Sequence, residues 1–310
     1  MNITYFLTKF ARALITMLLV VTFVFVVLRI TGDPAQTILP EDTTEEERQE
    51  FREMWDLDKP LHVQYLRYWK NLFHGSMGKS YRDKREVSQI MAERLPKTVY
   101  LMSLSILLSV IIAIPLGVKA ALNRNTFIDR LSMSTAVFGF SMPNFFLGIL
   151  LILLFSVKLK LLPSSGSDTW KHIILPLITS SVAHIGSYSR FTRSTMLSVM
   201  NKPYIRTATA TGLSRNSVIY GHALPNAAIP IVTIVGTSIG RIISGSIVIE
   251  TVFAWPGVGR LLVTSVGSRD MAVVQAIVLF LSISIVTANL AVDILYGFLD
   301  PRIRTRKGGK

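Results

Sequence analysis

The sequence predicts an all-α, polytopic membrane protein with six transmembrane helices. Half of its 310 residues are hydrophobic and its mean hydropathy is +0.46, values typical of membrane proteins rather than of soluble domains. The apolar residues gather in long runs that are separated by polar, mostly basic connections. A helix needs about twenty apolar residues to cross the hydrocarbon core of a bilayer, and the runs approach this length.

Six apolar runs carry this prediction. In chain order, the expected spans cover residues 13–28, 98–118, 131–157, 173–189, 226–249 and 271–298. The first span is short, but Arg29 can extend it by reaching to the interface. Pro143 lies near the middle of the third span and predicts a kink there, because proline removes a backbone donor from the helix. The fourth span is more weakly apolar.

Charge is distributed unequally between the connections. The chain has 33 Lys and Arg against 19 Asp and Glu, which gives a net charge of +14. Basic residues of the short connections collect on the side that holds both termini, and by the positive-inside rule this side is cytoplasmic. The excess charge then faces the cytoplasmic leaflet, and we expect no nucleic-acid partner. Because the sequence has no cysteine, disulfides and thiolate metal sites are excluded.

The pattern divides the chain into four parts. Residues 1–31 form an N-terminal cytoplasmic segment and the first span, residues 32–97 a long external loop, residues 98–299 a five-helix core, and residues 300–310 a basic cytoplasmic tail. Within the external loop, Thr44 and Glu47 predict a capping box. Leu61, Tyr65 and Trp69 then recur at helical spacing and predict an amphipathic helix. This helix lies either at the membrane interface or against the outer ends of the bundle.

A polar, basic stretch at residues 204–225 interrupts the apolar runs. It contains small residues at Thr207, Ala208 and Ala210, followed by Gly212. Small residues let a helix fit closely into a groove of another protein, and glycine ends a helix readily because it tolerates left-handed dihedral angles. Pro225 is expected to begin the next helix, where its missing donor costs little. The stretch therefore predicts a short helix, a break and a second helix, which together form a protruding segment that docks onto another protein.

The spacing of this stretch resembles the Glu-Ala-Ala loop of bacterial ABC importer permeases. Arg206, Thr207 and Ala208 occupy the Glu-Ala-Ala places, Gly212 with Leu213 the glycine position, and Leu224 with Pro225 the closing pair. The Arg-Thr-Ala form looks like the variant of the dipeptide, oligopeptide and nickel branch. Further motifs of that branch follow in order along nearly the whole chain, at residues 32–34, 57–61, 64–65, 75–80, 94–96, 141–145, 162–166, 253–259 and 300–304.

This resemblance implies a type I ABC importer permease fold in the bacterial cytoplasmic (inner) membrane. It also implies the partners: a second, homologous permease subunit, two cytosolic ATPase subunits, an external solute-binding protein and the lipid bilayer. The 204–225 stretch is then the coupling loop that seats in an ATPase subunit. ATP and Mg²⁺ are expected on the ATPases, so this chain is expected to have no cofactor and no catalytic site of its own.

Three residues are candidates for the translocation pathway: Arg241, His184 and Trp255. An ionised Arg241 inside the fifth span is costly unless it faces a polar cavity or a partner. We therefore expect it either to meet a polar or anionic part of the substrate or to pair with the partner permease. His184 lies in the fourth span, where a hydrogen bond to a neighbouring helix is the alternative role. Trp255 belongs to the connection at 250–269, which is expected to be a re-entrant turn or a plain surface loop.

Gly236, Gly240 and Ser244 repeat every four residues and predict a face for close helix packing. The five histidines are scattered and have no metal-ligand spacing, so no metal site is expected. Residues 78–80 read Gly-Lys-Ser but lack the earlier glycine of a phosphate-binding loop.

These features together favour the membrane subunit of an ATP-driven ABC importer, with a di- or oligopeptide as the favoured cargo. Nickel or a metal chelate is the alternative cargo for the same type of importer. A secondary transporter is the alternative of a different class. It works without ATPases and usually holds pairs of intramembrane acids, whereas this sequence offers mainly Asp293.

Overall fold

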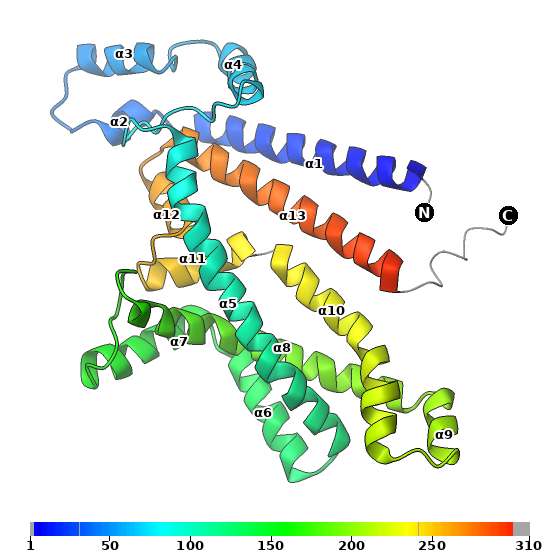
Figure 1. Cartoon of the computed structure of the whole chain (residues 1–310). Coiled ribbons are helices and arrows are strands. Elements are labelled where there is room, and N and C mark those ends of the chain that lie inside the picture. Colours follow the sequence, from blue (N-terminus) through cyan, green and yellow to red (C-terminus); the bar gives the residue numbers. More distant parts are fainter. Residues whose placement is uncertain (1–2, 31, 241, 300–310) are drawn as a thin grey trace. The chain divides into compact units, whose positions relative to one another are not determined.

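The computed structural model describes residues 3–30, 32–240 and 242–299, and Figure 1 shows the helices that it contains. Within these ranges the chain forms helices and turns and has no strand, apart from an isolated bridge between Lys79 and Glu86. The all-α prediction is confirmed. The fold divides into two compact units, one made of Asn2–Thr98 with Pro256–Val286 and the other of Val99–Trp255 with the chain from Thr287 onward.

Helices occupy all six predicted spans. Four stretches of the described residues are long and apolar enough to cross a membrane: Phe10–Ile30, Val87–Leu122, Ser217–Ile239 and Met271–Leu290. They belong to α1 (Ile3–Ile30), α5 (Val87–Leu122), η3 with α10 (Ser217–Ala223 and Leu224–Gly240) and α13 (Met271–Leu299). The fourth predicted span falls in α8 (Ile174–Met200), which is too polar to qualify because hydroxyl side chains and His184 interrupt its apolar residues.

The third predicted span is bent far more than a simple kink. It consists of α6 (Phe127–Ser141), α7 (Asn144–Leu151) and the π-helix η1 (Ile152–Lys158), and its two halves meet at an angle of 98°. The break falls at Met142 and Pro143, as proline predicts, because Pro143 ends the α6 hydrogen-bond ladder and starts α7. Counted as one span, this pair raises the number of candidate spans among the described residues to five.

Helices α5 and α8 pack closely through small polar residues. Ser105 and Ser181 lie 3.2 Å apart through their hydroxyls, and Ser109 Oγ donates to the Ser181 carbonyl at 3.2 Å. Further along, a Cβ atom on Gly117 would be 2.6 Å from both the Ser189 carbonyl oxygen and Thr192 Cβ. Only glycine therefore fits at position 117.

A repeat in the sequence marks this α5 face. It has a small residue every four positions, and all of them are buried: Ser105, Ser109, Ala113, Gly117 and Ala121. Such spacing places the residues on one side of a helix and lets the backbones approach. The four-residue spacing of small residues, which also occurs at Gly236, Gly240 and Ser244, thus extends over more residues on α5.

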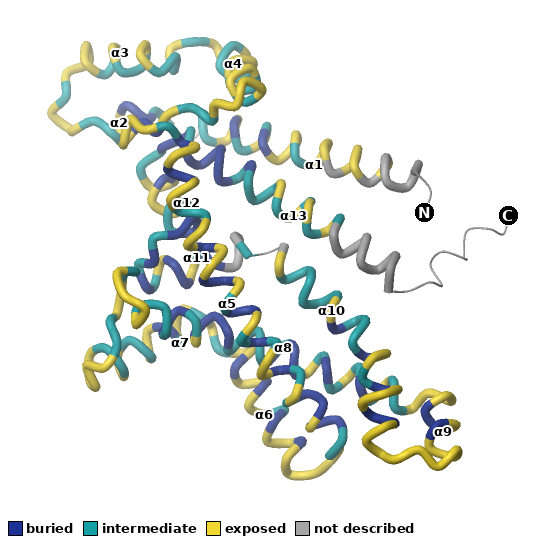
Figure 2. The backbone as a smooth tube through the Cα atoms, in the orientation of Figure 1, coloured by how far each residue is buried: buried dark blue, intermediate teal, exposed yellow. Residues whose placement is uncertain are grey.

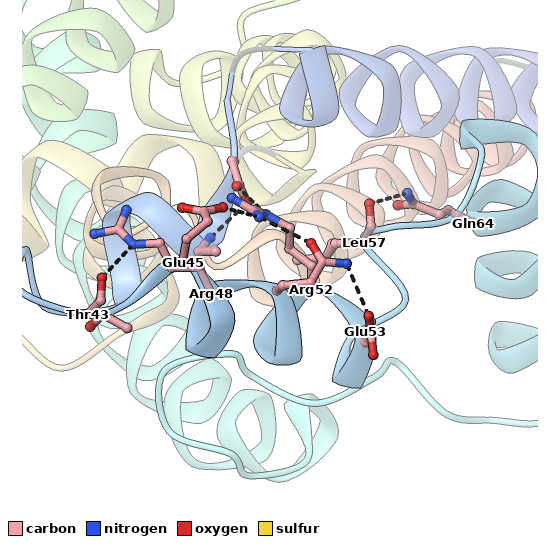
Figure 3. A network of polar contacts seen from close by, with 10 residues as sticks. Thr43, Glu45, Arg48, Arg52, Glu53, Leu57 and Gln64 are labelled. Atoms are coloured by element: carbon pink, nitrogen blue, oxygen red, sulfur yellow. Dashed lines mark hydrogen bonds and ion pairs between the residues drawn. The ribbon is translucent and has the colours of Figure 1, made fainter.

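The segment before α5 forms three short helices: α2 (Pro34–Ile38), α3 (Glu45–Met54) and α4 (Leu61–Phe73). The predicted capping box starts α3, with Glu47 N–H donating to Thr44 Oγ1 and Thr44 N–H donating to Glu47. Figure 3 shows the polar network around this helix. Arg52 is central to it, because its guanidinium binds Asp33 at 2.8 Å and Glu45 at 2.7 Å and so ties α3 to the start of α2.

Helix α4 packs against the end of α1, and its placement relative to the membrane interface stays a prediction. Tyr65 OH lies 2.7 Å from Thr22 Oγ1, and the Phe25 ring meets the Tyr65 ring edge-on at 5.1 Å between centroids. Arg29 Nε donates to Gln64 Oε1 at 2.5 Å. The opposite face of α4 stays exposed at Leu66 and Phe73, as the exposed (yellow) residues of α4 in Figure 2 illustrate.

The connection at 250–269 contains a helix of its own. After α11 (Ile242–Val252), the chain turns and forms α12 (Val258–Gly267). Val258 N–H, near the start of α12, donates to Thr98 Oγ1 at 2.8 Å, and both residues are buried. The segment is therefore not a plain surface loop, and the re-entrant turn stays a prediction.

Replacing Gly117 by alanine tests the α5–α8 packing. The added methyl group has no room, so we expect a loss of roughly 1–3 kcal/mol in stability, the usual range for overpacked interiors. The thermal unfolding midpoint of the detergent-solubilised chain measures it. Gly267→Ala is the control, because no atom lies within 4 Å of a Cβ at that exposed helical position. Equal midpoints for the two variants would contradict the close approach.

Candidate functional site

The 204–225 stretch begins with a short helix, α9 (Pro203–Ala210), which follows α8 directly. Pro203 occupies the first turn, where its missing N–H costs nothing. The helix ends with Thr211 N–H donating to the Thr207 carbonyl at 3.0 Å and Gly212 N–H donating to the Thr209 carbonyl at 3.1 Å. Gly212 has φ +81°, and a Cβ there would meet nothing within 4 Å. Glycine is therefore needed for its backbone angle alone, as the sequence predicted.

The second helix starts ten residues before Pro225, so the expectation that Pro225 begins it is wrong. Helical structure starts at Arg215, and Ser214 caps it: its hydroxyl accepts from Ser217 N–H at 3.3 Å. Pro225 lies inside the helix, just after the π-helical segment η3. In that segment Leu224 N–H donates to Ile219, five residues earlier. A π-turn accommodates proline because it shifts the hydrogen-bond register that proline would otherwise break.

Helix α9 has one buried face and one exposed face. Ile205 and Ala208 are buried, whereas Arg206 and Thr207 are exposed. Figure 2 shows this division along the helix. Beyond the break, Leu213 is 42% exposed, and Pro225 is also exposed while Leu224 is half-buried. Of the three residues at the Glu-Ala-Ala places, the first two thus face outward and the third faces the chain's own interior.

The buried face of α9 belongs to one hydrophobic cluster, which we call the α9 cluster. Its buried members come from five elements: Val118 and Ala121 of α5, Met196 of α8, Ile205 and Ala208 of α9, Val218, Ile219 and Ala223 of η3, and Ala227 and Ile231 of α10. A displacement of α9 therefore acts directly on α5, α8 and α10, because close-packed interiors transmit strain.

An ion pair that the sequence did not predict joins α6 to α8. Arg193 Nε and Nη2 each donate to one carboxylate oxygen of Asp129 at 2.6 Å. Asp129 is buried and also accepts from Asn125 N–H at 2.9 Å. Such two-pronged arginine–carboxylate pairs fix the geometry as well as the distance. The available signal was Asp129 itself, an isolated acid among the basic residues of its connection.

The two described pathway candidates, His184 and Trp255, have different surroundings. His184 is half-buried on α8 and stacks on Tyr188 with ring centroids 5.6 Å apart. Trp255 is buried in an apolar cluster with Leu101, Leu175, Ile249 and Phe253, so within this chain it packs against side chains. Arg241 lies outside the described residues, and its role stays a prediction.

The predicted packing face is only partly described. Gly236 and Gly240 lie on α10 and Ser244 on α11, while residue 241 between these helices is not described. The role of this face in helix packing stays a prediction as well.

The described residues contain no group of three or more His, Cys, Asp or Glu side chains that could hold a metal ion.

Two family descriptions match the chain. Residues 113–305 match "Binding-protein-dependent transport system inner membrane component", and residues 2–102 match "Binding-prot-dependent transport system membrane comp, N-term". Together they extend over almost the whole sequence.

Similar proteins agree with these descriptions. The glutathione transport system permease protein GsiC of Salmonella paratyphi A is 42% identical over 303 residues, which cover 97% of this chain and 99% of that protein. GsiC of Escherichia coli K12 is 42% identical over 285 residues, covering 92% and 93%. The solved MetNI methionine ABC transporter, in an inward-facing conformation, matches with a TM-score of 0.57 and 17% identity over 69% of this chain and 97% of that chain. At this identity the match concerns the fold.

Substitutions at Gly212 test the break after α9. In Gly212→Val we expect the left-handed backbone to cost roughly 1–2 kcal/mol, so the loop opens and trypsin cuts faster at Arg206 and Arg215. Gly212→Asn is the matched control, because asparagine adopts this conformation far more readily. Limited proteolysis of the detergent-solubilised chain measures both rates. If valine and asparagine gave the same rate, the left-handed break would be wrong.

Proposed function

The chain belongs to the family of binding-protein-dependent transport system inner membrane components, as an ABC importer permease of the peptide and nickel type, and we propose that α9 is its ATPase-coupling helix and glutathione or a similar short peptide its cargo. As a permease subunit it spans the inner membrane in several helices and is not catalytic on its own. Hydrolysis of ATP then occurs on partner subunits. The secondary-transporter alternative is set aside by the family.

The two-sided character of α9 is the observation that carries the coupling proposal. An outward face with Arg206, Thr207 and the neighbouring Leu213 is free to enter a groove of an ATPase subunit. The inward face, with Ile205 and Ala208, is held in the α9 cluster. A push or pull on the outward face therefore reaches α5, α8 and α10, whose rearrangement opens the pathway to one side of the membrane or the other.

The orientation and the partners form part of this proposal. With both termini and α9 on the cytoplasmic side, the basic short connections obey the positive-inside rule. The chain then pairs with a second permease subunit, receives two ATPases from the cytoplasm and takes its cargo from an external binding protein. His184, Arg241 and Trp255 remain candidates for the pathway between the two permease subunits.

Thr207→Trp tests the docking of α9. The exposed side chain leaves the fold of this chain intact, but an indole in a closely fitted groove prevents docking. We expect less ATPase subunit to co-purify and a substrate-stimulated ATPase rate lower by about tenfold or more, which corresponds to roughly 1.4 kcal/mol. Glu46→Trp on exposed α3 is the control and should behave as wild type. Undiminished co-purification and stimulation with Thr207→Trp would refute the docking proposal.

The similarity to glutathione permeases over nearly the full chain supports the cargo proposal. It is tested by uptake in cells that lack this chain, with labelled glutathione, a labelled dipeptide and labelled nickel in the same medium. We expect glutathione uptake to fall and to return when the wild-type chain is supplied again. Loss of dipeptide uptake alone would move the cargo to dipeptides, and loss of nickel uptake alone would refute the peptide proposal while leaving the coupling of α9 untouched.

A further inference from the structure

A cavity of about 300 Å³ lies in the unit that contains α1 and α4. Its walls come from the end of α1, the α3–α4 region, the 76–86 segment and the start of α13. Aromatic rings contribute Trp55, Tyr68 and Tyr81, and polar groups include Arg29 and Gln275. Nothing in the transport mechanism above makes use of this cavity.

Three of the lining residues have polar atoms without partners. Among the residues that the structure describes, Arg29 Nη1, Tyr68 OH and Gln275 Nε2 are buried and make no hydrogen bond. Gln275 as a whole is only 4% exposed. Leaving a buried polar group unpaired destabilises the fold, and more so when the group is charged. Three such atoms around one cavity indicate that a ligand with hydrogen-bonding atoms completes the site.

All three atoms act as donors. A guanidinium nitrogen and an amide nitrogen have no acceptor capacity. Burial, aided by Tyr65 and opposed by the charge of Arg29, raises the pKa of Tyr68 to about 12, so its hydroxyl keeps its proton at neutral pH. A ligand that pairs with Arg29 Nη1 and Gln275 Nε2 must supply acceptor atoms, and the Tyr68 hydroxyl can donate to the same ligand.

The charges of the lining favour a negative ligand. Asp56 is engaged by Arg67 and by Lys59 at 2.6 Å, and Glu86 lies 3.8 Å from Lys79. Arg29 has no carboxylate partner among the ion pairs of the described residues, and its Nε is held by the neutral Gln64. The guanidinium thus brings an uncompensated positive charge to the cavity.

The position of the cavity matches the level of lipid headgroups. Arg29 lies in the last turn of α1, where the apolar stretch Phe10–Ile30 ends. Aromatic side chains surround this end, with Tyr65, Tyr68 and Trp69 of α4 beside Phe25 of α1. Tyrosine and tryptophan concentrate where the hydrocarbon core meets water.

We propose that this cavity is a phosphate oxyanion site in which Arg29, Tyr68 and Gln275 donate hydrogen bonds to the ligand. Arginine suits phosphate because its planar donors match two oxygens at once. The phosphate comes either from a phospholipid headgroup at the membrane surface or from free phosphate in solution. The site is separate from the coupling surface and does not depend on the identity of the transported cargo.

The test is a thermal-shift titration of the delipidated transport complex in a phosphate-free maltoside detergent. The probes are dihexanoyl phosphatidylglycerol, inorganic phosphate and, as a phosphate-free control, dihexanoylglycerol. A ligand that binds only the folded chain raises the unfolding midpoint, because it stabilises that state by RT ln(1 + [L]/Kd). We expect a rise with phosphatidylglycerol and none with dihexanoylglycerol. A rise with the lipid only identifies a headgroup site, and an equal rise with inorganic phosphate identifies a site for the free ion.

Tyr68→Phe and Gln275→Leu separate binding from folding. Both remove an atom that has no partner within the described protein, so the midpoint without probe should not fall. The affinity for phosphatidylglycerol should fall by about tenfold in each, as for a lost hydrogen bond to a charged group.

Tyr65→Phe is the matched control. Its hydroxyl bonds Thr22 and does not line the cavity, so this variant should lose stability and keep its affinity. The proposal is overturned if neither phosphate-bearing probe shifts the wild-type midpoint, or if Tyr68→Phe binds as tightly as wild type.

Discussion

The close approach of α5 to α8 is the constraint on which the rest of this core depends. Inside a bilayer the lipid chains are as apolar as the side chains, so helices associate through tight van der Waals contact and interhelical hydrogen bonds. The small residues of α5 provide both, with Ser105 and Ser109 bonded to α8 and Gly117 in contact with its backbone. A larger residue at any of these places separates the helices.

This contact determines where the ends of α5 and α8 meet, and those ends carry the α9 cluster. Val118 and Ala121 follow Gly117 within about one turn of α5, and Met196 lies one turn after Thr192 of α8. The Asp129–Arg193 pair fastens α6 to the same part of α8. Helix α9 is thus seated on α5 and α8, which are already bound to each other, so its displacement moves them together instead of deforming one of them.

Much of this arrangement follows from the sequence, for identifiable reasons. Apolar runs reveal helices because the hydrocarbon core demands them, and Thr44, Pro143 and Gly212 mark helix boundaries by local backbone chemistry alone. The expectation that Pro225 begins the second helix was wrong because proline is also tolerated inside a helix after a π-turn. The helix begins after Ser214, which caps it. The Asp129–Arg193 pair could not be predicted from the local sequence, because its two residues are distant in sequence and meet only when α6 packs on α8.

Not every buried polar atom without a hydrogen-bond partner indicates a ligand. The Ser189 and Thr192 hydroxyls also lack partners among the described residues, yet both residues belong to the α5–α8 contact, where even a methyl group on Gly117 has no room. The free-energy cost of these unpaired hydroxyls is tolerated because the two residues fit the close contact between the helices. A smaller apolar residue would not have the same shape. Arg29, Tyr68 and Gln275 differ because they border an open volume, and each has an unpaired atom that can donate a hydrogen bond. Two tight helices leave no space for an acceptor, whereas the cavity beside α1 has space and lacks only the acceptor.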